Sequence, residues 1–137
     1  ARGRGAKAVR GERGRGAVKL DIGAELRRVG NTCLWSWQGW TAAWASEKSL
    51  RQWTLVNVLS ILACLMVEMT AGERALILAL GLLILAAEVM NTALEEVVDY
   101  LSTDRDPRAK KAKDCGSAAV ALTALAGGIA WLVVLIG

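Results

Sequence analysis

The sequence predicts an all-α membrane protein, in which an amphipathic surface helix precedes three transmembrane helices. Of its 137 residues, 54% are hydrophobic, Phe is absent and Pro occurs once. Leu, Ala and Val dominate instead, and this composition suits helices in lipid. The apolar residues form long runs, while Lys and Arg crowd the first third of the chain and residues 105–113. We therefore expect one membrane domain, residues 24–137, after a basic tail.

Residues 1–23 are rich in Arg and Gly and have no apolar periodicity, so they predict a flexible basic tail. No apolar segment follows the charges as it does in a secretory signal peptide. Such a tail binds either nucleic acid or anionic headgroups. Because apolar runs long enough to span a membrane occur further along the chain, we favour headgroup contact or plain disorder and expect no nucleic-acid partner.

Residues 24–48 have the pattern of an amphipathic helix. Trp37, Trp40 and Trp44 recur at i, i+3 and i+7, and polar side chains occupy other faces. Indole rings prefer the headgroup level of a bilayer. The segment therefore predicts a helix in the membrane surface, and the alternative is an amphipathic helix packed on protein.

Three apolar segments are long enough to cross a membrane: residues 52–70, 75–98 and 115–136. The first is short of the ~20 residues that a bilayer core requires, but Arg51 and Glu68 can snorkel at its ends. We expect a tight turn at residues 70–74 and a polar loop at 99–114. The positive-inside rule then places the N-terminus and this loop in the cytoplasm, and the C-terminus outside.

Polar residues in the second span lie on one face of the helix. At about 100° per residue, Glu88, Asn91, Glu95 and Asp99 follow one another at i, i+3, i+7 and i+11. A charge at the centre of a membrane helix costs roughly 2.5–3.5 kcal/mol on insertion scales. This stripe therefore predicts a functional site rather than a packing surface.

The predicted topology brings chemically complementary groups to the cytoplasmic boundary. Carboxylates suit a divalent cation with oxygen ligands, and cationic side chains suit phosphate oxygens. The chain has no His, no soluble-kinase signature and no paired cysteine motif. The carboxylates are Glu47, Glu95 and Asp99, and the cations are Arg28, Arg105 and Lys113.

Glu88 lies two helical turns deeper in the lipid than Glu95. A metal, phosphate-binding cations and a partly desolvated carboxylate are the components of phosphoryl transfer, where the carboxylate is the general base for an attacking hydroxyl. Because that base is inside the bilayer, the sequence predicts a lipid acceptor.

Two motifs carry a resemblance to a known family. The pattern Glu88-x-x-Asn91-x-x-x-Glu95-x-x-x-Asp99 and the later Ala112-Lys113-Asp114-Cys-Gly-Ser-Ala-Ala-Val120 resemble the small integral-membrane diacylglycerol kinases of bacteria. The likeness extends from about Arg28 to the C-terminus.

The resemblance implies a homotrimer in the bacterial inner membrane, with active sites shared between protomers at the cytoplasmic face. It also implies transfer of the γ-phosphate of Mg-ATP to the primary hydroxyl of diacylglycerol, which gives phosphatidic acid. The expected partners are diacylglycerol, ATP and membrane lipids, and the expected cofactor is Mg²⁺.

Residue by residue, the resemblance implies that Glu88 is the catalytic base and that Glu47 and Glu95 hold the metal ion. Trp35 stands where the family often has Tyr, and Trp53 replaces an acidic residue. The residues implied to contact the nucleotide are Arg28, Trp35, Glu47, Glu95, Asp104, Arg105, Asp106, Lys113 and Asp114. Those implied to contact the lipid substrate are Arg28, Trp37, Trp44, Glu88, Asn91 and Ser117.

Other functions remain open at this point. The sister activity is phosphorylation of a polyprenol such as undecaprenol. A small proton-coupled transporter also uses a membrane Glu, but it leaves Glu47, Lys113 and Asp114 unexplained. The chain could also be a non-catalytic assembly or regulatory protein, which would tolerate Glu88→Gln. Glu96 is expected to be a solvated residue at the helix end.

Overall fold

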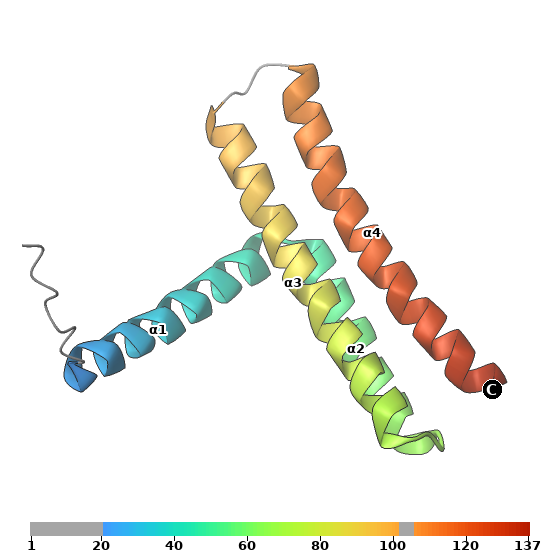
Figure 1. Cartoon of the computed structure of the whole chain (residues 1–137). Coiled ribbons are helices and arrows are strands. Elements are labelled where there is room, and N and C mark those ends of the chain that lie inside the picture. The colour runs from blue at the N-terminus through green and yellow to red at the C-terminus, as the bar shows by residue number, and fades with distance from the viewer. Residues whose placement is uncertain (1–20, 102–105) are drawn as a thin grey trace, which may run out of the picture. The chain divides into compact units, whose positions relative to one another are not determined.

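The computed structural model describes residues 21–101 and 106–137, and every element in them is a helix. These are α1 (Ile22–Ser46), α2 (Lys48–Met66), α3 (Ala71–Leu101) and α4 (Pro107–Ile136) (Figure 1). The prediction of an all-helical chain is therefore confirmed. The expected basic tail, apart from its last residues, and Asp104 and Arg105 lie outside the described residues. The chain divides into two units, residues 1–34 and 35–137.

Helix α1 begins and ends two residues before the predicted helix, residues 24–48. Its start follows from Asp21, whose Oδ1 accepts a hydrogen bond from the Ala24 amide at 3.1 Å, the usual way of satisfying a free N–H at a helix start. At its end, Glu47 has extended backbone angles and separates α1 from α2. Arg51 of α2 donates to the carbonyl of Trp44 at 2.5 Å and ties this junction. That α1 lies in a membrane surface stays a prediction.

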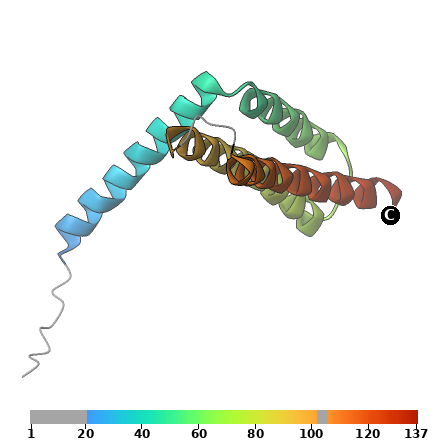
Figure 2. The ribbon, with the colours of Figure 1, turned by 90° about the horizontal axis from the view of Figure 1, so that it is seen from above.

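Helices α2, α3 and α4 are each long and apolar enough to cross a membrane. Within the unit of residues 35–137, α3 packs against α2 and against α4 (Figures 1 and 2). Helix α3 has 31 residues. At about 1.5 Å per residue it is longer than a hydrocarbon core of about 30 Å. One end of α3 therefore extends beyond the lipid when its apolar part spans it.

The expected turn at residues 70–74 is wrong. The connection occupies residues 67–70, and α3 begins at Ala71. The cause is a reciprocal cap: the Thr70 amide donates to Glu73 Oε2 at 2.7 Å, and the Glu73 amide donates to Thr70 Oγ1 at 3.3 Å. This Thr-x-x-Glu arrangement satisfies free donors and draws residues 71–74 into the helix.

The expected polar loop at residues 99–114 is also mostly helical. Helix α3 continues to Leu101, and α4 begins at Pro107. Asp106 caps α4 by accepting from the Arg108 amide at 2.7 Å, and proline is favoured at the first helical position. Hydrogen bonding from the Arg108 side chain holds the pKa of Asp106 below its usual value. Strong capping residues therefore outweigh the polarity of the segment.

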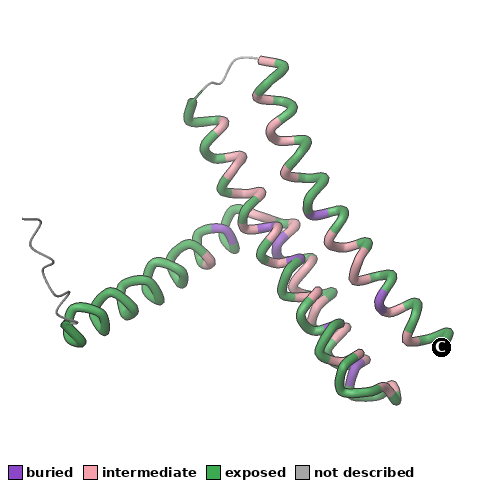
Figure 3. The backbone as a smooth tube through the Cα atoms, viewed as in Figure 1, coloured by how far each residue is buried: buried purple, intermediate pink, exposed green. Residues whose placement is uncertain are grey.

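The buried core lies where the end of α2 meets the start of α3 and the end of α4. Cys64, Ile77 and Ala130 form it, and Trp131 packs against them. The Trp131 indole donates to Ser60 Oγ at 2.8 Å and links α4 to α2. Figure 3 shows that much of the remaining surface of these helices is exposed. An exposed apolar surface of this kind suits contact with lipid or with other membrane helices.

Candidate functional site

The site is built on one face of α3. Ile77, Ile84 and Glu88 are the buried residues of this helix, and their spacing places them on a single stripe. Glu88 is 5% exposed and is the buried charged side chain among the described residues. The Thr92 hydroxyl donates to the Glu88 backbone carbonyl at 3.1 Å, which is a local contact within the helix.

One turn further along the stripe, an amide and a carboxylate are joined. Asn91 Nδ2 donates to Glu95 Oε1 at 3.1 Å. Asn91 Oδ1 is buried and has no hydrogen-bond partner among the described residues. It faces Gly116 of α4, where an added Cβ would collide with it. Helices α3 and α4 therefore approach each other closely at the level of the polar stripe.

At the end of the stripe, α4 contributes a cation. Lys113 Nζ lies 2.6 Å from Asp99 Oδ1, and both side chains are partly exposed. Lys110 pairs with Asp114 one turn away at 2.5 Å. Asp99 and Lys113 therefore lie together at this end of α3 and α4, and Asp99 is paired with Lys113 instead of standing as a free metal ligand. That this end faces the aqueous boundary stays a prediction.

The other expected site residues are less closely grouped. Within residues 21–101 and 106–137, no group of three or more acidic or thiol side chains is placed to hold a metal ion. Glu47 is half-buried at the junction of α1 and α2. Arg28 is exposed and pairs with Glu25 at 3.6 Å. The remaining expected residues that lie exposed are Trp35, Trp37, Trp44, Asp114 and Ser117.

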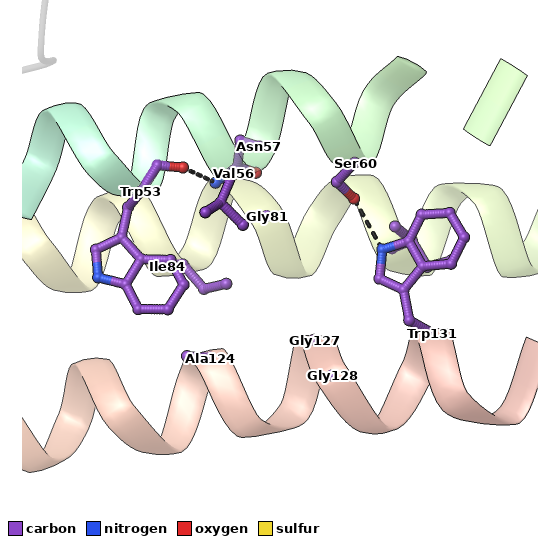
Figure 4. A pocket seen from close by; sticks show the side chains of 11 residues that line it. Trp53, Val56, Asn57, Ser60, Gly81, Ile84, Ala124, Gly127, Gly128 and Trp131 are labelled. Carbon is purple, nitrogen blue, oxygen red and sulfur yellow. Dashed lines mark hydrogen bonds between the residues drawn. The ribbon is translucent and has the colours of Figure 1, made fainter. Parts of the chain in front are cut away.

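Sequence reasoning missed a cleft of about 190 Å³ between α2, α3 and α4. Figure 4 shows Trp53 and Trp131 toward its two ends, with Gly127 and Gly128 of α4 between them. Gly81 and Ile84 of α3 also line it. They precede Glu88 by two turns and one turn, so the cleft and Glu88 share a face of α3. The small residues of the three helices were the only sequence signal for it.

Asn57 also lines this cleft and marks a second close helix approach. Its Nδ2 donates to the Trp53 carbonyl at 3.0 Å. Its Oδ1 faces Gly81, where an added Cβ would collide with it. The α2–α3 contact thus repeats, at a distance from the polar stripe, the glycine–asparagine packing found between Gly116 and Asn91.

Comparison with known proteins places the chain. Residues 34–135 match the model of a family described as prokaryotic diacylglycerol kinase. A diacylglycerol kinase of Pseudomonas aeruginosa is 41% identical over 114 residues, which cover 82% of this chain and 91% of that protein. One from Escherichia coli K12 is 32% identical over 74% of this chain and 83% of its own length. One from Haemophilus influenzae is 33% identical over 77% and 90%, respectively. The matched region contains Glu88, Asn91, Glu95 and Lys113, and the chain belongs to the prokaryotic diacylglycerol kinase family.

Proposed function

We propose that this chain transfers the γ-phosphate of Mg-ATP to the primary hydroxyl of diacylglycerol and so makes phosphatidic acid. As a member of the prokaryotic diacylglycerol kinase family, it is an ATP-dependent lipid kinase. The observation that carries the residue-level proposal is Glu88: a carboxylate 5% exposed on an apolar helix. A charged side chain at the centre of a membrane helix costs roughly 2.5–3.5 kcal/mol, so we infer a functional role for Glu88.

The depth of Glu88 determines the kind of acceptor. Seven residues separate it from Glu95, which corresponds to about 10 Å along a helix. With Glu95 at the water boundary, Glu88 lies inside the hydrocarbon. The alcohol that reaches it must therefore be dissolved in the membrane, as diacylglycerol is.

Glu88 acts as the general base. It accepts the proton of the lipid hydroxyl while the hydroxyl oxygen forms a bond to the γ-phosphorus. The bond from that phosphorus to the bridging oxygen breaks, and ADP leaves. A positioned base of this kind contributes about 100- to 10,000-fold to the rate.

The side-chain oxygens on α3 suit the coordination of a magnesium ion that arrives with the nucleotide. Mg²⁺ prefers oxygen ligands and is usually held by one or two carboxylates together with substrate phosphates and water. The Glu95 carboxylate provides protein oxygens on this face of α3, and the Asn91 amide donates to it. In our proposal Glu95 and Glu47 would hold the ion, and the ion would supply positive charge to offset that of the transferring phosphate.

The remaining roles follow the family resemblance. Nucleotide contacts come from Arg28 and Lys113, whose cationic groups suit phosphate oxygens. We also assign nucleotide contacts to Trp35, Asp104, Arg105, Asp106 and Asp114. We assign contacts with the lipid substrate to Trp37, Trp44, Asn91 and Ser117, and also to Arg28 and Glu88.

The enzyme is a homotrimer in this proposal, with each site shared between neighbouring protomers. Two features support it: the large exposed apolar surface of α2–α4, and the absence, within the described part of one chain, of a complete acidic cluster for the metal. The basic residues of the first third of the chain and of residues 105–113 support a topology in which both segments lie on the cytoplasmic side of the bacterial inner membrane.

The test is an activity measurement with two lipid alcohols. Purified protein in detergent micelles receives Mg-ATP with dioctanoylglycerol or with undecaprenol, and the phosphorylated lipid is quantified. We expect phosphatidic acid as the main product. Undecaprenyl phosphate as the main product would show that the acceptor is a polyprenol and not diacylglycerol. No phosphorylated lipid in either mixture would contradict the proposed kinase function.

A further inference from the structure

Gly116 stands out among the glycines of α4 for what lies opposite it. A Cβ added there would overlap Asn91 Oδ1 and lie 3.1 Å from Leu94 Cδ2. No described glycine has a positive φ, so the helix backbone itself does not require glycine at this position. Since glycine is a poor helix former, its role here is to make room for the asparagine side chain.

The space left by Gly116 determines where the Asn91 amide lies. Its Oδ1 is enclosed against α4, which leaves Nδ2 directed along α3 to Glu95 Oε1 at 3.1 Å. One turn from Gly116, Lys113 pairs with Asp99 at 2.6 Å. This ion pair joins α4 to α3 at the end of the polar stripe, so the glycine is held opposite Asn91.

We propose that Gly116 is a positioning residue for phosphoryl transfer: its missing side chain seats the Asn91 amide, and that amide orients the Glu95 carboxylate. The proposal rests on the proposed function, in which Glu95 holds the magnesium nucleotide. Gly116 itself touches neither substrate nor metal. It acts through Asn91.

Gly116→Ala is therefore expected to displace the Asn91 side chain and break its hydrogen bond to Glu95. Displacing a catalytic arrangement by about 1 Å costs on the order of 100-fold in rate. We expect a fall of about that size in kcat/KM for Mg-ATP, together with a need for more Mg²⁺ to reach half-maximal rate.

The chain offers two matched controls. Gly81→Ala creates the same kind of collision, with Asn57 Oδ1 at the α2–α3 contact and away from the polar stripe. Gly127→Ala adds a methyl to the α3–α4 interface at an ordinary 3.5 Å contact with Ile84. A purely structural role for Gly116 predicts that Gly81→Ala and Gly116→Ala have similar kinetic effects. The positioning role predicts that only Gly116→Ala changes the Mg²⁺ dependence.

A second readout needs no activity. The chain has three asparagines, Asn31, Asn57 and Asn91, so selective ¹⁵N-asparagine labelling gives three pairs of side-chain amide signals, one pair for each residue. Gly116→Ala should shift the Asn91 signal and leave that of Asn31 in place. Gly81→Ala should shift the Asn57 signal instead. An unmoved Asn91 signal in folded Gly116→Ala overturns the proposal, even if activity falls.

A double variant completes the test. Asn91→Ala removes the amide that the added methyl strikes, so Gly116→Ala should cause no further kinetic loss in that background. An additional loss as large as in wild type overturns the proposal. If Gly116→Ala alone does not fold but the double variant does, the result supports the placement of the Asn91 side chain against Gly116. If neither variant folds, the proposal is refuted. Full activity in Glu95→Gln would refute the proposed function. The Asn91 signal in Gly116→Ala would still test whether Gly116 determines the position of the Asn91 side chain.

Discussion

Replacing Glu88 with Gln should lower activity and raise stability at the same time. The amide keeps the shape of a side chain that is 5% exposed, but it cannot accept a proton from the lipid hydroxyl. Loss of a general base lowers kcat by about 100- to 10,000-fold. The same change removes a charge that costs roughly 2.5–3.5 kcal/mol at the centre of a membrane helix. A site that is strained for function commonly gains stability when its function is removed.

The assay pairs two measurements on the same preparation. Turnover is followed as ADP release with Mg-ATP and dioctanoylglycerol in micelles, and stability as the midpoint of unfolding by SDS. Glu96→Gln is the matched control, because Glu96 lies on the same helix and is exposed. We expect little change in it by either measure. A Glu88→Gln protein with turnover within tenfold of wild type, or one that is clearly less stable, would refute the reasoning.

Three further predictions test other parts of the account. Trp131→Phe removes the indole donor to Ser60 and should lower the free energy of unfolding by about 0.6 kcal/mol, at most ~1.7 kcal/mol; an equal effect in a Ser60→Ala background would show that the bond contributes nothing. The pKa of Asp106 is lowered in the folded protein by hydrogen bonding from Arg108, so its contribution is complete above the unfolded value of about 3.9 and is lost as pH falls through the folded value. Asp106→Asn keeps a capping side chain and should therefore lose less stability than wild type between pH 5 and pH 3, measured by helical circular dichroism; equal acid sensitivity would count against the capping role. Removal of Mg²⁺ with EDTA should abolish phosphorylation of dioctanoylglycerol, and added Mg²⁺ should restore it; turnover that persists in EDTA would exclude a metal-bound nucleotide.

The long-range pattern of the fold was accessible from the sequence because lipid imposes it on each helix separately. Runs of apolar residues predicted three membrane helices, and α2, α3 and α4 have the required length and composition. The 3.6-residue period also placed Glu88, Asn91 and Glu95 on one face, where Asn91 and Glu95 are now seen to be bonded. These features depend on one helix at a time.

Local capping chemistry was underestimated. Polarity at residues 70–74 and 99–114 predicts loops, but Thr70 with Glu73 and Asp106 with Pro107 are standard helix starts. A polar segment remains helical when its first free N–H groups are capped. These capping residues are visible in the sequence, and they determine the helix starts more strongly than mean polarity does.

Contacts between helices were not accessible in the same way. The seat of Asn91 against Gly116 depends on the register of α3 against α4, and the cleft depends on three helices at once. Glycines in membrane helices indicate close approach, but they do not identify the partner side chain. Glu47 shows the same limit: its expected metal role requires a neighbour that its position in the sequence does not specify.

The central claim is that a membrane-dissolved alcohol reaches Glu88, and photolabelling tests it directly. A short-chain diacylglycerol with a diazirine beside its free hydroxyl is irradiated with the folded protein in micelles, and labelled residues are identified by mass spectrometry. We expect label on Glu88 and adjacent residues of α3, and we expect unlabelled dioctanoylglycerol to displace it. Label confined to other helices, or label at Glu88 that dioctanoylglycerol does not displace, would contradict the account.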